Sequence, residues 1–136
     1  MTDSTYKGSC HCQRVKFEVT LDLSRGSTKC NCTFCTKARW WSSIVKPAAF
    51  TLLTGEDALT KYVGPNNPSG EQFFCKHCGV RPFMRGNLPQ LGGEYVGVAL
   101  ACLDGVPPEA LLAGPVRVCD GRANAWMQTP SFVAHL

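Results

Sequence analysis

The sequence predicts a small, mainly β protein in which short strands are joined by metal knuckles. Three observations point to this fold class. Apolar and polar residues alternate with a period of two between Val15 and Val19, as they do in a half-buried strand. Turn-forming residues interrupt the chain often, above all in the Gly- and Pro-rich stretch 64–70. Seven of the nine cysteines lie in three short clusters whose spacings are typical of metal sites.

The first half of the chain contains five predicted strands. Segment 10–19 ends in the alternating run, and residues two apart on an extended segment share one face. Residues 27–30 lead into the second cysteine cluster. Residues 40–45, with the sequence WWSSIV, are rich in aromatic and β-branched side chains, which favour strands. Residues 50–53 and 58–63 lie on either side of a Gly-Glu-Asp turn.

The second half adds three strands and the single helix that we expect. The loop 64–70 is too rich in Pro and Gly for regular structure, and residues 71–74 then lead into the third cysteine cluster. The long apolar run 94–103 predicts a central strand. Residues 108–113 predict a short helix and residues 116–119 a last strand, so helices are few and short.

The cysteine spacings predict two metal sites of unequal kind. Thiolate zinc is usually four-coordinate, and seven cysteines divide into a set of four and a set of three. Four sulfurs close a structural site, whereas three leave a position open for water or a substrate. Gly79, which follows the third cluster, can adopt the positive φ that a metal knuckle often needs. The clusters are Cys10-x-Cys12, Cys30-x-Cys32-x-x-Cys35 and Cys75-x-x-Cys78.

Other uses of these cysteines are less consistent with the pattern. Core cysteines do not recur two and three residues apart in three places. A disulfide scaffold is disfavoured by the odd number of cysteines, by the lack of an apolar signal segment and by the geometry of Cys-x-Cys pairs. A thioredoxin-like role for Cys75 and Cys78 lacks the βαβ pattern, and iron–sulfur ligation is a weaker alternative to zinc. We therefore expect two zinc ions in a cytoplasmic protein.

Composition and charge restrict the other partners. Residues 1–136 suit one zinc-binding domain with an ordinary apolar fraction of 44%. The formal charge of +4 would fall by roughly three once seven thiolates hold two zinc ions. Because the basic residues are scattered, we expect no nucleic-acid partner. The longest apolar run is too short to cross a bilayer, so we expect no membrane partner. The oligomeric state is left open.

The cysteine motifs resemble those of one known family. They are Gly8-Ser-Cys-His-Cys12, Cys30-Asn-Cys-Thr-Phe-Cys35 and Phe74-Cys-Lys-His-Cys-Gly-Val-Arg-Pro-Phe83. Their order and types are similar to those of the glutathione-dependent formaldehyde-activating enzymes, a family that also includes centromere protein V. The resemblance runs from about residue 8 to residue 103. It implies a folded-over β arrangement like that of the B-type methionine sulfoxide reductases.

The resemblance also implies an assignment of the metal ligands, which spacing alone leaves open. In the family the first and last pairs share the structural zinc, which would place it on Cys10, Cys12, Cys75 and Cys78. The middle cluster, Cys30, Cys32 and Cys35, would hold a catalytic zinc with an open position. The implied activity is that of a carbon–sulfur lyase or synthase. It would form or cleave a thiol–aldehyde adduct such as S-hydroxymethylglutathione, and a thiol sulfur would occupy the open position.

Residues near the middle cluster are candidates for binding the small thiol substrate. Lys37 and Arg39 can pair with carboxylates, Trp40 can form a pocket wall with its neighbour, and Arg81 can approach from the third motif. A common family form has a glycine and one aromatic residue after the middle cluster, whereas this chain has the bulkier Ala-Arg-Trp-Trp. The substrate is therefore glutathione or a smaller or more apolar thiol.

Two other functional classes stay open. A zinc-stabilised module without catalysis would bind a protein partner, as centromere protein V is thought to do. A thiol-redox enzyme would need only one structural zinc and would use Cys119, which lies at a predicted strand end. Cys102, in the apolar run, is expected to be an inert core thiol. Loss of zinc and of turnover on substitution of Cys32 would distinguish catalysis from both alternatives.

Overall fold

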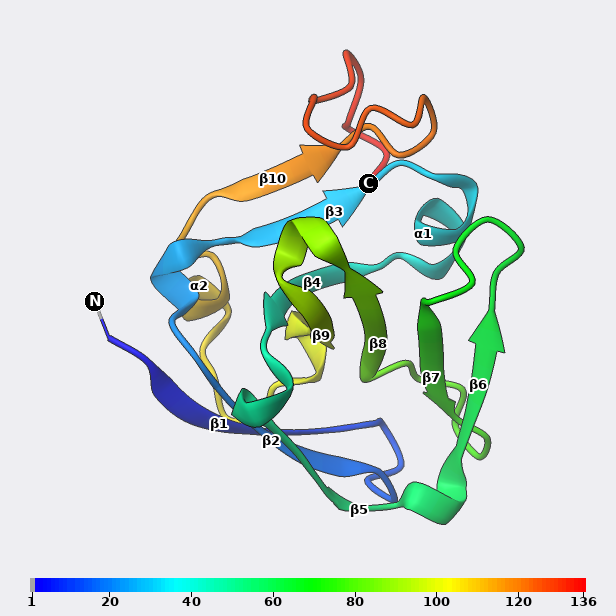
Figure 1. Cartoon of the computed structure of the whole chain (residues 1–136). Helices are drawn as coiled ribbons and strands as arrows, with labels where there is room; N and C mark the ends of the chain where they lie inside the picture. Colours follow the sequence, from blue (N-terminus) through cyan, green and yellow to red (C-terminus); the bar gives the residue numbers. More distant parts are fainter. Residues whose placement is uncertain (1) are drawn as a thin grey trace.

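The computed structural model describes residues 2–136 and contains a small antiparallel β-sheet and a larger mixed β-sheet (Figure 1). The smaller sheet has the strand order β1-β2-β5 and lies below the larger one in the view of Figure 1. The larger sheet has the order β10-β3-β4-β9-β8-β7-β6. The mainly β prediction is confirmed, and the predicted central strand, β9, is the middle strand of the larger sheet. The comparison with methionine sulfoxide reductases stays a prediction.

The strands and helices are short. The strands are β1 (Ser4–Ser9), β2 (Lys16–Leu21), β3 (Ser27–Cys30), β4 (Trp41–Val45), β5 (Phe50–Thr54), β6 (Leu59–Val63), β7 (Glu71–Cys75), β8 (Phe83–Leu88), β9 (Gly93–Ala99) and β10 (Val116–Cys119). The α-helices are α1 (Thr33–Ala38) and α2 (Pro108–Leu111). The 3₁₀ turns are η1 (Leu23–Arg25), η2 (Pro47–Ala49), η3 (Glu56–Ala58), η4 (Pro89–Leu91) and η5 (Leu100–Cys102).

Aromatic side chains hold the two sheets together. Phe17 of β2 and Phe50 of β5 stack with their ring centroids 5.4 Å apart. Phe50 in turn contacts Phe83 of β8, with a centroid separation of 4.7 Å, so one aromatic row runs from the small sheet into the large one. Phe17 and Phe83 are almost completely buried, and the valines of β9 complete this core. Burial of such side chains stabilises the fold by about 2 kcal/mol each.

A single glycine allows the small sheet to approach the segment after β9. A Cβ atom on Gly8 would collide with the ring of Phe17 and with the carbonyl oxygen of Cys102. Gly8 also forms an isolated β-bridge with Leu103. The main chain of β1 therefore packs against the end of η5, and the first cysteine cluster, directly after β1, lies beside the third.

Several predicted elements differ from the structure. Cys10 to Cys12 are not extended, because the turn between β1 and β2 occupies residues 10–15, with Gln13 at a φ of 67°. Strand β1 was not predicted, since its sequence STYKGS carries no regular apolar pattern. Helix α1 was not predicted either. The apolar run that contains β9 ends as a strand at Ala99 and continues as η5, and helix α2 ends at Leu111.

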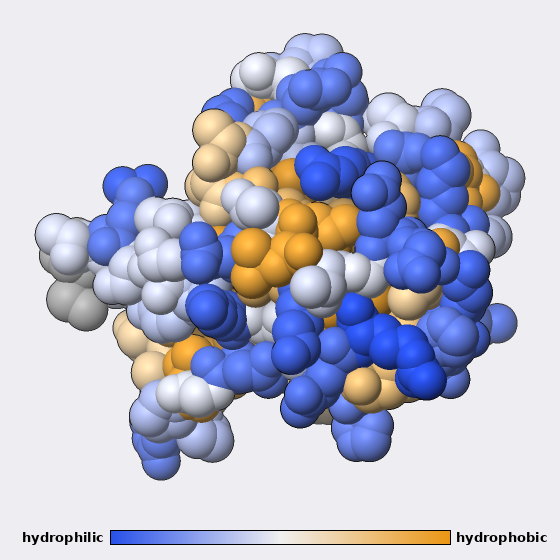
Figure 2. All heavy atoms as spheres, turned by 90° about the horizontal axis from the view of Figure 1, so that it is seen from below, coloured by the Kyte–Doolittle hydropathy of each residue, from blue (hydrophilic) through white to orange (hydrophobic). Residues whose placement is uncertain are grey.

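The surface is mixed in character. Seen from below, the molecule is mainly hydrophilic, and its apolar atoms gather in small patches (Figure 2). None of the helices among residues 2–136 is both long and apolar enough to span a bilayer.

Candidate metal centres

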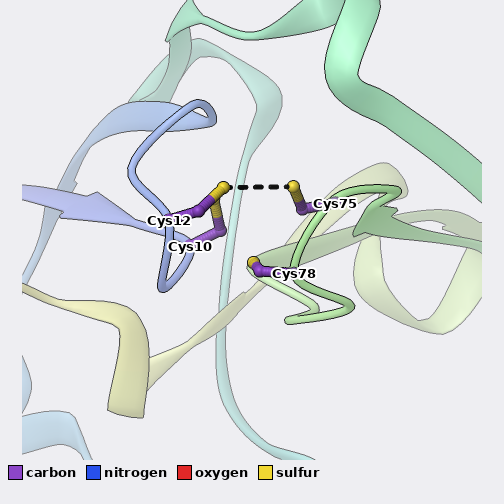
Figure 3. A group of neighbouring side chains, drawn as sticks. All are labelled: Cys10, Cys12, Cys75 and Cys78. Carbon is purple, nitrogen blue, oxygen red and sulfur yellow. Dashed lines mark hydrogen bonds between the residues drawn. The ribbon is translucent and has the colours of Figure 1, made fainter.

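Two loops bring four cysteines into one cluster. Cys10 and Cys12 lie in the turn after β1, and Cys75 and Cys78 lie at the end of β7 and in the turn that follows (Figure 3). The sulfur of Cys12 lies 3.6 Å from the sulfur of Cys10 and 3.6 Å from that of Cys75. All four sulfurs lie within 4.8 Å of one another. Gly79 closes the second turn with a φ of 76°, as the sequence predicted.

The four-cysteine cluster fits a tetrahedral zinc ion. Zinc–sulfur bonds of about 2.3 Å at tetrahedral angles place the sulfurs about 3.8 Å apart, close to the spacing found here. Main-chain amides support the sulfurs from outside: the N–H of Val15 donates to Cys10, and that of His77 donates to Cys75, each at 3.4 Å. Such donors stabilise the deprotonated thiolates that zinc requires.

The surroundings of Cys10 and Cys12 differ in electrostatics. The main-chain N–H of Arg14 and its guanidinium lower the pKa of Cys12 to about 6. Burial raises the pKa of Cys10 to about 11, because desolvation disfavours a lone thiolate. A divalent ion bound by all four sulfurs would supply the positive charge that stabilises the buried Cys10 thiolate.

The second cluster contains three cysteines at the start of α1. Cys30 ends β3, Cys32 caps the helix and Cys35 lies in its first turn. The N–H of Cys32 donates to the sulfur of Cys30, and the N–H of Cys35 donates to that of Cys32, both at 3.3 Å. The three sulfurs lie within 4.8 Å of one another. Among residues 2–136, no further His, Cys, Asp or Glu joins this group.

The three thiols are electrostatically coupled. The hydrogen bond from Cys35 is the main cause that lowers the pKa of Cys30 to about 6. The same hydrogen bond raises the pKa of Cys35, because Cys35 must keep its proton to donate it to the charged sulfur of Cys30. The set can therefore hold at least one thiolate at neutral pH without a metal. Three sulfurs in this arrangement can bind zinc and leave a coordination position open.

An aromatic cleft of about 670 Å³ lies beside the three-cysteine cluster. Arg81 is stacked in its wall, with its guanidinium carbon 3.7 Å from the ring centroid of Trp40 and 4.7 Å from that of Phe34. Its Nη2 donates to Gln72, whereas its Nε and Nη1 are buried without a hydrogen-bond partner. Burial lowers the pKa of Arg81 to about 10, and the charges of Cys35 and Cys32 oppose this shift.

A smaller cavity, of about 160 Å³, reaches the sulfur cluster itself. Cys30 and Cys35 both line it, whereas the larger cleft is lined by no residue of the cluster. Arg39, Trp40 and Trp41 line both spaces and form the wall between them. A small molecule in this cavity would lie beside two of the three sulfurs.

The structure brings three of the four predicted substrate-binding residues to these spaces. Arg39 and Trp40 line both, and Arg81 lines the larger cleft. Lys37 is exposed on α1 and lines neither of the two. Cys102 is buried beside the larger cleft, where its sulfur lies 4.0 Å from the carbonyl oxygen of Arg81.

Comparison with known proteins identifies the family. Residues 5–116 match the sequence model of the family described as glutathione-dependent formaldehyde-activating enzyme. The chain belongs to this family. The description of the glutathione-dependent formaldehyde-activating enzyme family implies an enzyme that activates formaldehyde with the thiol glutathione. The two cysteine groups, one of four and one of three, are both able to bind metal.

A solved structure is similar to this chain over most of its length. It is the crystal structure of a protein from Rhodobacter sphaeroides, with 29% sequence identity and a TM-score of 0.64. The similarity covers 81% of this chain and 98% of that chain. The fold described above is therefore shared with an experimentally determined structure.

Sequence reasoning missed several residues around the candidate sites of this family member. Phe34 lies between Cys32 and Cys35 in the sequence and lines the larger cleft, and its place inside the cysteine motif is the one signal that could have indicated it. Tyr62 and Gln72 come from β6 and β7, and no local pattern connects those strands with α1. Phe34 and Tyr62 stack with ring centroids 5.4 Å apart.

Proposed function

We propose that this protein is a zinc-dependent carbon–sulfur lyase or synthase that acts on thiol–aldehyde adducts such as S-hydroxymethylglutathione. Cys10, Cys12, Cys75 and Cys78 would hold a structural zinc, and Cys30, Cys32 and Cys35 a catalytic one. The observation that carries the proposal is the unequal pair of sulfur clusters in a chain of this family. The four-sulfur cluster has no vacancy for a substrate, whereas the three-sulfur cluster adjoins a cavity.

The proposed reaction joins a thiol and an aldehyde. The sulfur–carbon bond forms at the carbonyl carbon, the carbonyl π bond breaks, and the thiol proton finally resides on the new hydroxyl oxygen. A zinc ion on three cysteines supplies a vacant position and a positive charge that favours the ionised form of the thiol. Because three thiolate ligands already donate charge to the metal, thiol chemistry is favoured over activation of water.

The chain's own residues supply substrate binding in this proposal. Arg81 is held in place by its stack on Trp40, and two of its guanidinium nitrogens have no hydrogen-bond partner. A substrate carboxylate could pair with these nitrogens once the side chains that cover them move aside. Arg39 adds a second cation where the two cavities meet, and Lys37 adds a third on the outer face of α1. Because Trp40 and Trp41 are bulky, a bound glutathione would have to extend its peptide backbone along the apolar cleft. A smaller or more apolar thiol fits the same lining.

Two further features of the proposal concern the cellular context. All nine cysteines are free, which suits a reducing compartment, and we propose the cytoplasm. A small thiol is the proposed partner. The two alternatives, a non-catalytic zinc module and a thiol-redox enzyme with one structural zinc, give opposite results in the experiment below.

Substitution of Cys32→Ala tests the proposal directly. The variant should bind one zinc ion in place of two, keep its circular dichroism spectrum and lose catalysed exchange between glutathione, formaldehyde and their adduct, measured by NMR. Cys119→Ala is the matched control, because Cys119 is not a member of either sulfur group. Unchanged exchange in Cys32→Ala, or absence of catalysis in the zinc-loaded wild type, contradicts the lyase proposal. Loss of activity in Cys119→Ala alone would support the redox alternative.

A further inference from the structure

We propose that residues 120–136, here called the capping segment, are a functional part of the three-cysteine site, with Gly121 as the residue that positions Cys30. The segment follows β10 and packs against the end of β3 and near α1 (Figure 1). It lies outside residues 5–116, which match the family. The inference rests on the proposed metal at this site, but it concerns how the chain holds a ligand, not the reaction.

The strand pairing delivers the capping segment to the cluster. β10 runs parallel to β3, and the last pair in register is Cys119 with Cys30. The next residue of each strand continues the contact, because the N–H of Asn31 donates to the carbonyl oxygen of Cys119 at 3.2 Å. Residues 120–122 therefore turn directly over the first ligand of the three-cysteine cluster.

A hydrogen-bonded clamp fixes this turn. The side chain of Asn31, between two of the ligands in sequence, is buried. Its Nδ2 donates to Oδ1 of Asp120 at 2.9 Å, and its Oδ1 accepts the N–H of Arg122 at 2.9 Å. The Nε of Arg122 also donates to the main-chain oxygen of Asn31 at 3.2 Å. Both the nitrogen and the oxygen of this buried amide thus hold the capping segment on the cluster. Breaking such buried hydrogen bonds is costly.

Gly121 is the point of closest approach. A Cβ atom at this position would lie 2.6 Å from the sulfur of Cys30 and 2.6 Å from the ring of Trp126, so no side chain fits between them. The main chain of Gly121 therefore packs directly against the first ligand of the cluster, and any side chain here would displace that sulfur. Groups that contact a metal ligand from outside orient it, and changing them typically weakens metal binding by about 10- to 100-fold.

The rest of the capping segment limits access to the same sulfurs. Nη1 of Arg39 donates to the carbonyl oxygen of His135 at 2.6 Å, and Leu136 lines the small cavity with Cys30 and Cys35. Cys30 is only 9% exposed, whereas Cys32 and Cys35 are half-buried. The segment therefore covers one side of the cluster and leaves the sulfurs of α1 as the open side.

The test compares metal binding by Gly121→Ala and Gly64→Ala. Alanine at 121 must displace the sulfur of Cys30, whereas the nearest atom to a Cβ at 64 lies 3.8 Å away. We expect Gly121→Ala to weaken zinc at the three-cysteine site by about 10-fold or more in chelator competition and to shift the sulfur-to-cobalt charge-transfer bands of the cobalt(II) protein. The four-cysteine site should be unchanged in both variants. Wild-type zinc affinity and cobalt spectrum in a folded Gly121→Ala protein would overturn the proposal.

A second pair of variants decides the question if Gly121→Ala fails to fold. Asp120→Ala removes the acceptor for Asn31, while Asp120→Asn keeps an oxygen in the same place. We expect zinc affinity and cobalt spectrum at the three-cysteine site to change in Asp120→Ala and to be restored in Asp120→Asn. Equal spectra and affinities in both, with only a lower melting temperature in Asp120→Ala, would show a purely structural contact. Because no turnover is measured, failure here is distinct from failure of the proposed lyase function.

Discussion

The guanidinium of Arg81 stacks on the indole ring of Trp40, with its central carbon 3.7 Å from the ring centroid. Arg81 lies three residues after Cys78 of one sulfur cluster, and Trp40 lies five residues after Cys35 of the other. The stack therefore connects the segments that carry the two candidate metal centres. Cation–π contacts of this kind contribute about 1–2 kcal/mol when they are desolvated.

Arg81→Met should weaken substrate binding more than it weakens the fold. Methionine keeps much of the apolar contact with Trp40 but removes the two unpaired nitrogens that we propose for a substrate carboxylate. Charged hydrogen bonds contribute about 1.5–3 kcal/mol, so we expect KM for a carboxylate-bearing thiol to rise by about 10- to 100-fold. Steady-state kinetics and a melting curve measure the two effects. Lys7→Met is the control, since Lys7 is exposed on β1, lines neither cavity and should leave KM unchanged. An unchanged KM in Arg81→Met would show that Arg81 is only structural.

Cys75→Ser should unfold the protein rather than inactivate it selectively. Cys75 is completely buried in the four-cysteine cluster, and zinc binding at such a site supplies folding free energy. We expect loss of a cooperative thermal transition, and the same result when a strong chelator removes zinc from the wild type. Cys119→Ser, a half-buried thiol outside both clusters, should melt close to the wild-type temperature. A folded, metal-free Cys75→Ser protein would show that this cluster is not structural.

Thiol modification should distinguish the two remaining cysteines by pH. Burial raises the pKa of Cys102 from 9.0 to about 11, so at pH 8 its thiolate fraction is about 100-fold lower than that of an ordinary cysteine. Its alkylation rate should rise about tenfold for each pH unit between 8 and 10, because thiolate accumulates as the pH approaches the pKa. In zinc-loaded protein, mass spectrometry should find Cys119 modified first, Cys102 slowly and the seven clustered cysteines protected. Rapid labelling of Cys30, Cys32 and Cys35 would indicate that the second site holds no metal.

The sequence predicted the strands with apolar patterns but not the structure around the metal clusters. The predicted strands 40–45 and 71–74 correspond to β4 and β7, where aromatic and β-branched residues are frequent. Helix α1 was missed because its six residues, TFCTKA, are too few for an amphipathic period, and the cysteine cap at its start resembles a loop. The turn at residues 10–15 was missed because the strand-like alternation after it was extended back to Cys10. The prediction of one domain over residues 1–136 stays a prediction.

The candidate sites were predictable only where the ligands are close in sequence. The cysteine groups followed from spacing, and the pairing of the first cluster with the third followed from the family resemblance. The proximity of Asp120 and Arg122 to Asn31 depends on the parallel pairing of β10 with β3, across about ninety residues, and no local pattern reports that pairing. The aromatic cleft likewise joins α1 to β6 and β7.

Leu136→Ala should widen the range of aldehydes that the enzyme accepts. Leu136 lines the small cavity beside Cys30 and Cys35, and alanine would enlarge its volume of about 160 Å³. Because one or two methylene groups in an apolar pocket change discrimination by about 10- to 200-fold, we expect adducts of propanal or butanal to gain at least tenfold in kcat/KM relative to the formaldehyde adduct. Competition between these adducts, followed by NMR, measures the ratio. Leu112→Ala is the matched control, since Leu112 is exposed and lines neither cavity. A constant ratio in Leu136→Ala would show that the aldehyde does not occupy this cavity.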